Sequence, residues 1–452
     1  MQSRRTRWTG ARGRGRAGWS SASRLCALAL LMATAPVTWA AAPPDPLTIE
    51  SAVRFALQNS YAVERAAGRL RERGGELTHA QRLFPSNPQL SVTAGSEEEK
   101  ATGEDADVLG VRISQELWIA GQGGLRERAA SERRDAARSE LAFLRASLSA
   151  RVRAAWLRVL AAREERQTAG RLLSLARENL AITEQRLEAG AAQAMDRNAA
   201  AVAVARARAA RARARSRFRS ARLELGRRLS VQPGTLPGIE GELEPIELDL
   251  PADGVLARRA AQRRADLKAA SKRVEAARAD LRLSRREVIP NLKVFAFNEE
   301  TDGREEETGI GVGLELPLFN RRSGENEAAR ARIDQAQTER DALLLAVRAA
   351  VREGLANYRG ARERVAALSG QGLSSAQRNV TLVREAYSAG KVGSGALVTA
   401  QRQLFDVRED YLDALRDLVT AATDIERATG GLITVSGAPQ GGDATDTNTA
   451  EN

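Results

Sequence analysis

The stretch RARAARARARSRFRSAR, residues 206–222, decides the fold. Placed on a helix at about 100° per residue, it shows arginines on two opposite faces and two stripes of small residues between them. An ordinary surface helix has one apolar stripe, so two opposed stripes predict a neighbouring helix on each side and water on the two remaining faces. The first stripe contains Ala207, Ala210, Ala214, Phe218 and Ala221, and the second contains Ala209, Ala212, Ser216 and Ser220.

Two long segments without proline predict very long helices next to this stretch. They cover residues 124–189 and 324–389, so each contains 66 residues. At about 1.5 Å per residue, each helix is on the order of 100 Å long. A helix of this length is typical of a coiled coil or a tube. We expect some of the glycines in the second segment to mark bends, namely Gly354, Gly360, Gly370 and Gly372.

The chain divides into two copies of one pattern: a helix, two short strands, a very long helix, a glycine turn and a returning helix. In the first copy we expect a helix over 48–83 and strands over 89–93 and 108–118. In the second copy we expect a helix over 255–288 and strands over 291–297 and 309–319. The predicted organisation is a signal peptide (1–42), a first repeat (43–231), a linker (232–251), a second repeat (252–435) and a disordered tail (436–452).

The first 42 residues have the composition of a secretory signal. Seven arginines and no acidic residue occur before Leu25, a short apolar run follows, and small residues precede Ala42. Removing seven arginines from the formal net charge of +12 leaves +5. The basic character is therefore partly a sorting signal, and we expect no nucleic-acid partner.

The strand-like runs predict a membrane-facing sheet. Residues 108–118 place Val111, Ile113, Gln115 and Leu117 on one side, and residues 309–319 alternate more regularly. Strands of a transmembrane barrel alternate between an apolar outer face and a polar inner face. Four strands cannot close a barrel with a usable lumen, so several chains have to contribute. Aromatic residues that suit interfacial girdles are Trp118, Phe295, Phe297 and Phe319, and a function as core anchors is equally consistent with Phe295 and Phe297.

Two acidic loops connect the paired strands. Residues 96–107 and 298–308 each carry six acids against one basic residue, so each has a net charge of −5. A solvated loop explains such a run, and an anionic ring at the outer mouth of a channel is the functional alternative. The acids are Glu97, Glu98, Glu99, Glu104, Asp105 and Asp107 in the first loop, and Glu299, Glu300, Asp302, Glu305, Glu306 and Glu307 in the second.

Sites for chemistry are not expected. Cys26 lies in the signal and His79 is the only histidine, so we expect no His/Cys metal site, no cofactor and no catalytic set. Residues 309–313 (GIGVG) lack the lysine and the following helix of a phosphate-binding loop. The sequence is therefore not interpreted as an enzyme.

The mature chain resembles the TolC-like outer-membrane efflux proteins. The resemblance is carried by the opening helix from Leu47 to Asn59, by the strand-to-helix junctions at 114–117 and 317–321, and by the Ala-Gly pairs at Gly190 and Gly390. Residues 317–324 and the run 87–90 favour the heavy-metal (cobalt–zinc–cadmium) branch.

This resemblance implies a mainly α fold with a small β part. Long antiparallel helices of a homotrimer form an α-barrel, and four strands per chain contribute to one transmembrane β-barrel in the lipid of a Gram-negative outer membrane. The helical tips would dock a periplasmic membrane-fusion (adaptor) protein, which connects the channel to an inner-membrane pump of the resistance-nodulation-division type. The implied tip residues are Gly190, Ala191, Ala192, Asp196, Gly390, Lys391, Val392 and Gly393, with Asp196 in a closed-state charge network.

Three functions remain open from the residues alone. The first is an efflux channel for metal cations or drugs. The second is the outer-membrane conduit of a type I protein secretion system. The third is a periplasmic coiled-coil scaffold without a barrel, against which the paired strands argue.

Overall fold

The computed structural model describes residues 43–98, 105–251, 253–301, 305–319 and 321–433. The predicted signal peptide and the whole of the predicted tail lie outside these ranges, as do Glu99, Glu104 and Asp302. The described chain is mostly helical and has one small sheet, as predicted.

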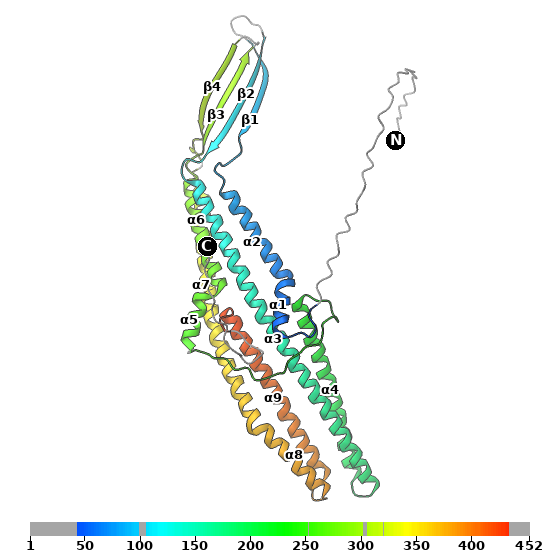
Figure 1. The fold of residues 1–452 in the computed structure, drawn as a ribbon. Coiled ribbons are helices and arrows are strands. Elements are labelled where there is room, and N and C mark those ends of the chain that lie inside the picture. Colours follow the sequence, from blue (N-terminus) through cyan, green and yellow to red (C-terminus); the bar gives the residue numbers. More distant parts are fainter. Residues whose placement is uncertain (1–42, 99–104, 252, 302–304, 320, 434–452) are drawn as a thin grey trace, which may run out of the picture. The chain divides into compact units, whose positions relative to one another are not determined.

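The order helix, helix, strand, strand, long helix, helix occurs twice along the chain (Figure 1). The first half contains α1 (Ile49–Asn59), α2 (Tyr61–Ala80), β1 (Gln89–Glu98), β2 (Asp105–Leu117), α3 (Gln122–Glu188) and α4 (Ala194–Leu229). The second half contains α5 (Asp253–Arg263), α6 (Ala265–Arg286), β3 (Leu292–Thr301), β4 (Glu305–Leu314), α7 (Ser323–Ala367), the π-helical turn η1 (Leu368–Gly372), α8 (Leu373–Ser388) and α9 (Ser394–Thr429).

The two opening helices differ from the prediction, because each is broken into two. Ser60 and Arg264 adopt extended ψ angles of 117° and 130°, which end the first helix and begin the next. Arg264 also explains the second break: its guanidinium donates a hydrogen bond to the carbonyl of Ala428 (2.6 Å) and pairs with Asp266 (2.6 Å). The start of α6 is thereby held against the end of α9.

The glycines of the second long helix behave in two ways. Gly370 and Gly372 lie in η1, where the helix departs from α geometry as expected for a bend. Gly354 and Gly360 lie in regular α7. Gly354 is there for close packing, because a Cβ at this position would lie 3.1 Å from the Ile425 side chain of α9.

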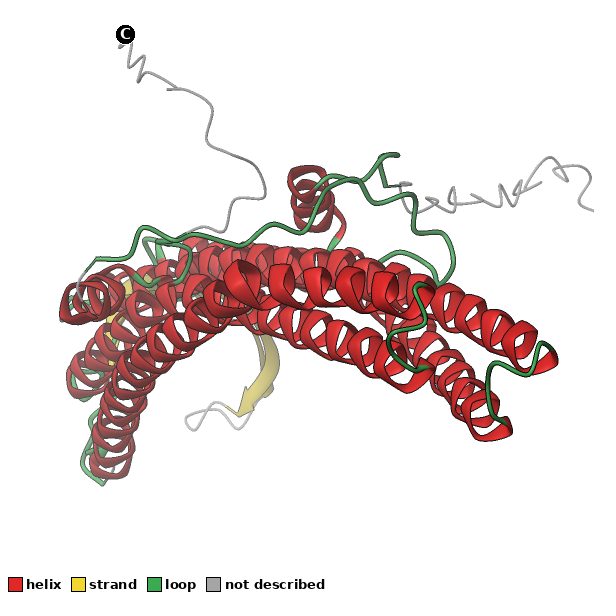
Figure 2. Cartoon of the chain, turned by 90° about the horizontal axis from the view of Figure 1, so that it is seen from below, coloured by secondary structure: helices red, strands yellow, loops and turns green. Residues whose placement is uncertain are grey.

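Most of the helices lie side by side in one curved row, seen from below in Figure 2. Helix α3 packs against α4 and α9 along one part of its length and against α2 and α6 along the other. The largest apolar cluster fills the middle of this row and includes Trp156, Leu225, Tyr358 and Leu418, all at most 3% exposed. The central part of the row therefore has a continuous core, although aromatic residues are scarce.

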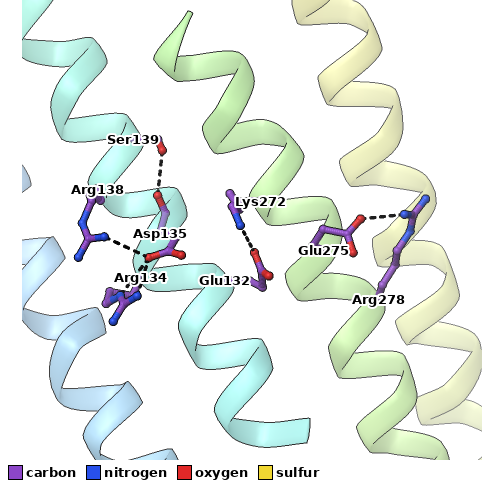
Figure 3. A network of polar contacts seen from close by, with 8 residues as sticks. All are labelled: Glu132, Arg134, Asp135, Arg138, Ser139, Lys272, Glu275 and Arg278. Atoms are coloured by element: carbon purple, nitrogen blue, oxygen red, sulfur yellow. Dashed lines mark hydrogen bonds and ion pairs between the residues drawn. The ribbon is translucent and has the colours of Figure 1, made fainter. Parts of the chain in front are cut away.

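Ion pairs hold α3 to α6. Glu132 of α3 pairs with Lys272 of α6 at 2.9 Å (Figure 3). Arg133 of α3 pairs with Asp280 of α6 at 2.5 Å. The hydrogen bond to Glu132 raises the pKa of Lys272. Such half-exposed pairs contribute at most about 1 kcal/mol each to the free energy of unfolding. Their main effect is to favour the pairing of α3 with α6 over other helix pairings.

The segment between the two halves crosses the helices as an extended strap. Tyr358 of α7 donates a hydrogen bond to the Ile246 carbonyl (3.0 Å) and accepts one from the Leu248 N–H (2.8 Å). Arg163 of α3 donates to the carbonyls of Ile239 and Gly241. Gly241 has φ 140°, and a Cβ there would collide with the Trp156 ring. The strap is thus fixed to α3 and α7.

The sheet is antiparallel, with strand order β1-β2-β3-β4. In the register Val92 pairs with Val111, and Ile113 with Ala296, which pairs with Ile310. These residues share one face, on which Leu90, Val92, Ile310 and Val312 are all more than 60% exposed. The predicted alternation is confirmed over these strands, but β4 ends at Leu314, so Leu316 and Leu318 lie beyond the sheet.

Candidate functional site

The first helical tip joins α3 to α4. Gly190 adopts φ 72°, and the Ala191 N–H donates to the Arg186 carbonyl (2.7 Å), which completes a glycine-type helix end. Asp196 accepts a hydrogen bond from the Gln193 N–H (3.0 Å) and so caps α4. Ala191 is exposed and Ala192 half-buried. Asp196 therefore has a capping function, and its place in a charge network stays a prediction.

The second tip joins α8 to α9 with the same backbone design. Gly390 adopts φ 71°, and the Lys391 N–H donates to the Ala386 carbonyl (2.9 Å). Gly393 is the N-cap of α9. Lys391 is exposed and Val392 half-buried. The structure thus places all eight predicted tip residues at two exposed helix reversals.

One contact between the two hairpins was not predicted from the sequence. The Arg186 guanidinium of α3 lies 4.5 Å from the ring centroid of Tyr387 of α8, and Tyr387 is buried. The signal was present in the two tip motifs, because Arg186 lies four residues before Gly190 and Tyr387 three residues before Gly390. The contact therefore connects equivalent ends of the two hairpins.

The acidic segments are mostly strand, not loop, which corrects the predicted boundaries. Glu97, Glu98 and Asp105 lie at the ends of β1 and β2, Asp107 within β2, and Glu299, Glu300, Glu305, Glu306 and Glu307 within β3 and β4. Backbone pairing continues to Glu98 and Asp105 in the first hairpin and to Thr301 and Glu305 in the second, so each hairpin is longer than predicted. Glu300 pairs with Glu306 and Glu299 with Glu307. Like charges directly opposite each other destabilise a sheet, so sheet stability does not explain these acids.

The second face of the sheet carries an arginine between two aromatic rings. The Arg112 guanidinium lies 4.9 Å from the Phe295 ring centroid and 5.8 Å from that of Phe297. The rings cover Gly311 and Gly309, where a Cβ would lie 2.4 Å and 2.6 Å from ring atoms. Phe295 and Phe297 lie on the face opposite to the exposed aliphatic residues and pack over the two glycines, which favours core anchors over the girdle interpretation.

Helix α4 has one covered stripe and one uncovered stripe. Ala207 and Ala214 of the first stripe are 2% and 1% exposed. All four residues of the second stripe are exposed within the chain, namely Ala209, Ala212, Ser216 and Ser220. The neighbour predicted for this second stripe is not supplied by the described chain.

Among the residue ranges that the structure describes, none of the helices is long and apolar enough to cross a membrane. The same ranges hold no group of three or more His, Cys, Asp or Glu residues placed to bind a metal ion. His79 is exposed and lies near the end of α2.

Comparisons with known proteins match most of the chain. The profile of the family described as "Outer membrane efflux protein" covers residues 52–229 and 256–431. The cobalt-zinc-cadmium resistance protein CzcC of Cupriavidus metallidurans is 26% identical over 387 residues, which is 85% of this chain and 90% of CzcC. The pyoverdine export outer membrane protein OpmQ of Pseudomonas aeruginosa is 25% identical over 407 residues, 85% of each chain.

The fold also matches a solved structure. The outer membrane protein VceC of Vibrio cholerae superposes with a TM-score of 0.72 at 19% sequence identity, over 85% of this chain and 96% of VceC. The two segments matched by the family profile begin in α1 and α5 and end at the last residue of α4 and just after α9.

Proposed function

Because the chain belongs to the outer membrane efflux protein family, we propose that it is the passive outer-membrane channel of a tripartite efflux system and works as a homotrimer. Proteins of this family are channels of the Gram-negative outer membrane with a long periplasmic helical part. The finer assignments below are the trimer, its partners and its cargo.

The four-stranded sheet is the observation that carries the proposal. One face exposes Leu90, Val92, Ile310 and Val312, as a lipid-facing surface does. In the described chain β1 and β4 are each paired on one side only. Unpaired strand edges cannot remain open in lipid, so the β4 edge of one chain pairs with the β1 edge of the next until the barrel closes.

The uncovered stripe of α4 supports the same assembly. Residues of this stripe are small, which allows a second helix to approach closely. A neighbouring protomer supplies that helix in our proposal. The long helices then form a closed wall below the barrel, with the arginine faces of α4 in water on both sides.

The tips are proposed to dock the adaptor protein, which connects the channel to a pump of the resistance-nodulation-division type. Exposed reversals at Gly190 and Gly390 are the ends of the long helices, and Lys391 adds an exposed positive charge at the second tip. No catalytic step is assigned to the chain. The chain provides only the channel, through which cargo delivered by the pump and the adaptor leaves the cell.

For the cargo we propose a metal cation or a small organic compound. CzcC is named for cobalt, zinc and cadmium resistance and OpmQ for pyoverdine export. Growth of a deletion strain in cobalt, zinc or cadmium salts, and separately with organic toxic compounds, distinguishes the two classes. A strain that is unaffected by all of them would argue for protein secretion.

Light scattering and planar bilayers test the channel itself. The chain lacking residues 1–42 and purified in detergent is expected to have the mass of a trimer and to give discrete conductance steps. A soluble, non-conducting species that needs no detergent would overturn the proposal.

A further inference from the structure

We propose that Arg112, held between Phe295 and Phe297, forms an oxyanion-binding ring inside the barrel, and that it selects cargo bearing carboxylate or phosphate groups. This inference rests on the trimeric barrel proposed above. It deepens that function by naming the class of cargo, because a bare metal cation has no oxyanion group to offer.

The side of the sheet that carries Arg112 follows from the register. Arg112 pairs with Ser91 on β1 and with Phe297 on β3, and Phe297 pairs with Gly309 on β4. These residues alternate with Val111, Ile113 and Ile310 of the exposed apolar face. If the apolar face is in contact with lipid, then the guanidinium lies on the lumen side.

The two rings orient the guanidinium and leave its donors open. An aromatic face attracts a cation over its centre, so Phe295 and Phe297 hold the arginine by stacking. Within the described chain, the Arg112 side chain makes no hydrogen bond and no ion pair, and it is exposed. A planar guanidinium with free N–H groups binds carboxylate or phosphate in a bidentate manner.

The glycines of β4 complete the site. Rings at Phe295 and Phe297 occupy the space above Gly311 and Gly309, so any side chain at these two positions would displace them. Two glycines of the segment GIGVG (309–313), Gly309 and Gly311, are thus explained by the space that the two aromatic rings need. An arginine that served only solubility would not need two stacked rings and two glycines beneath them. This arrangement therefore indicates a binding function for Arg112.

Charges of both signs then follow one another in the lumen. Glu299 lies two residues further along β3 than Phe297 and on the same face, so the acidic strand ends lie beyond the Arg112 ring. In the trimer, three copies of Arg112 surround one passage, where a multivalent anion is attracted by all of them.

Single-channel recording with inorganic phosphate as the probe tests the ring. For the wild-type trimer we expect inorganic phosphate to reduce the single-channel conductance. For R112Q we expect the block to weaken about tenfold or more, because the charge is removed. R112K keeps the charge but not the planar stacking, so an intermediate block is expected.

Two further variants separate the site from a general charge effect. F295L combined with F297L is expected to weaken the phosphate block while leaving all charges unchanged. R54Q, which removes an exposed arginine of α1 remote from the sheet, is expected to leave the block unchanged.

The outcomes distinguish this inference from the channel proposal. A wild-type chain that forms no conducting trimer contradicts the channel, and the ring with it. A normal channel whose phosphate block and ion selectivity are the same in R112Q overturns the ring alone. Trimer mass and wild-type helix content in R112Q show that the variant has folded.

Discussion

The Arg186 guanidinium lies 4.5 Å from the centre of the Tyr387 ring, and this contact joins the hairpin of the first half to the hairpin of the second half. Arg186 lies four residues before Gly190, and Tyr387 lies three residues before Gly390. A cation–π contact of this kind contributes about 0.5–2 kcal/mol, depending on how well water is excluded. Tyr387 is 5% exposed. Because its ring is shielded from water, the contact is expected to stabilise the association of the two hairpins.

Arg186→Ala is therefore expected to loosen the tips. Removing the guanidinium leaves the ring without its partner, and we expect a larger mean single-channel conductance and more frequent open events in planar bilayers. Arg177→Ala serves as a control, because Arg177 is an exposed arginine of the same helix. Identical conductance in the Arg186 and Arg177 variants would exclude a gating function for the contact.

Ala212→Leu is expected to prevent trimer formation. Ala212 belongs to the uncovered stripe of α4, where a larger side chain keeps the neighbouring helix at a distance. Light scattering in detergent should show mainly monomers with wild-type helix content. Arg215→Leu adds a similar side chain on a water-facing side of α4 and should remain trimeric. Trimers in both variants would show that the stripe is not an interface.

Neutralising the acids of the second strand hairpin is expected to lower cation selectivity. The change replaces five glutamates by glutamine, and reversal potentials in a salt gradient measure its effect. Fewer negative charges at the mouth attract fewer cations. The replaced residues are Glu299, Glu300, Glu305, Glu306 and Glu307.

A matched control for this experiment lies in the strap, where five exposed acids are also available. Replacing them by amides removes the same charge far from the sheet, so the reversal potential should stay at the wild-type value. If the reversal potential is unchanged in the hairpin variant as well, the acids of the hairpin do not affect ion selectivity and serve only to keep the strand ends solvated. The strap residues are Glu240, Glu242, Glu244, Glu247 and Asp249.

Tyr358→Phe is expected to destabilise the attachment of the strap. The hydroxyl is buried and makes two hydrogen bonds to the strap backbone. Its loss leaves the Leu248 N–H and the Ile246 carbonyl without this partner, which costs about 1–3 kcal/mol. Thermal unfolding followed by circular dichroism should show a lower midpoint. Tyr411→Phe removes a hydroxyl from a half-buried tyrosine outside the strap, so a drop of equal size there would remove the hydrogen-bond explanation.

The sequence predicts the helices and the alternation of the strands because both have a local cause. Proline-free segments and glycine turns place α3, α4 and α9 within a few residues of their observed ends, and the predicted helix over 324–389 corresponds to α7, η1 and α8 taken together. The break at Arg264 could not be predicted in this way. It depends on the Ala428 carbonyl, which is far away in the sequence and becomes a neighbour only after α9 has packed.

The same distinction applies to the functional surfaces. Tip glycines were predictable because a helix reversal needs a left-handed residue at that position. Arg112 and Phe295 come together only through the register of β2 with β3, which the alternation pattern does not specify. Their pairing therefore appears in the structure and not in any single stretch of the sequence.

The π-helical turn at Leu368–Gly372 has a consequence for the symmetry of the two tips. The helical segments leading to Gly190 and Gly390 are almost equal in length, with 67 residues in α3 and 66 from Ser323 to Ser388, but only the second contains such a turn. One wide turn changes the helical phase by up to about 100°, the rotation of one residue. Side chains at matching sequence positions of α3 and α8 thus point in different directions. In the proposed trimer, the six tips would then present two kinds of surface in alternation, three of each, and a docking partner could tell the two kinds apart.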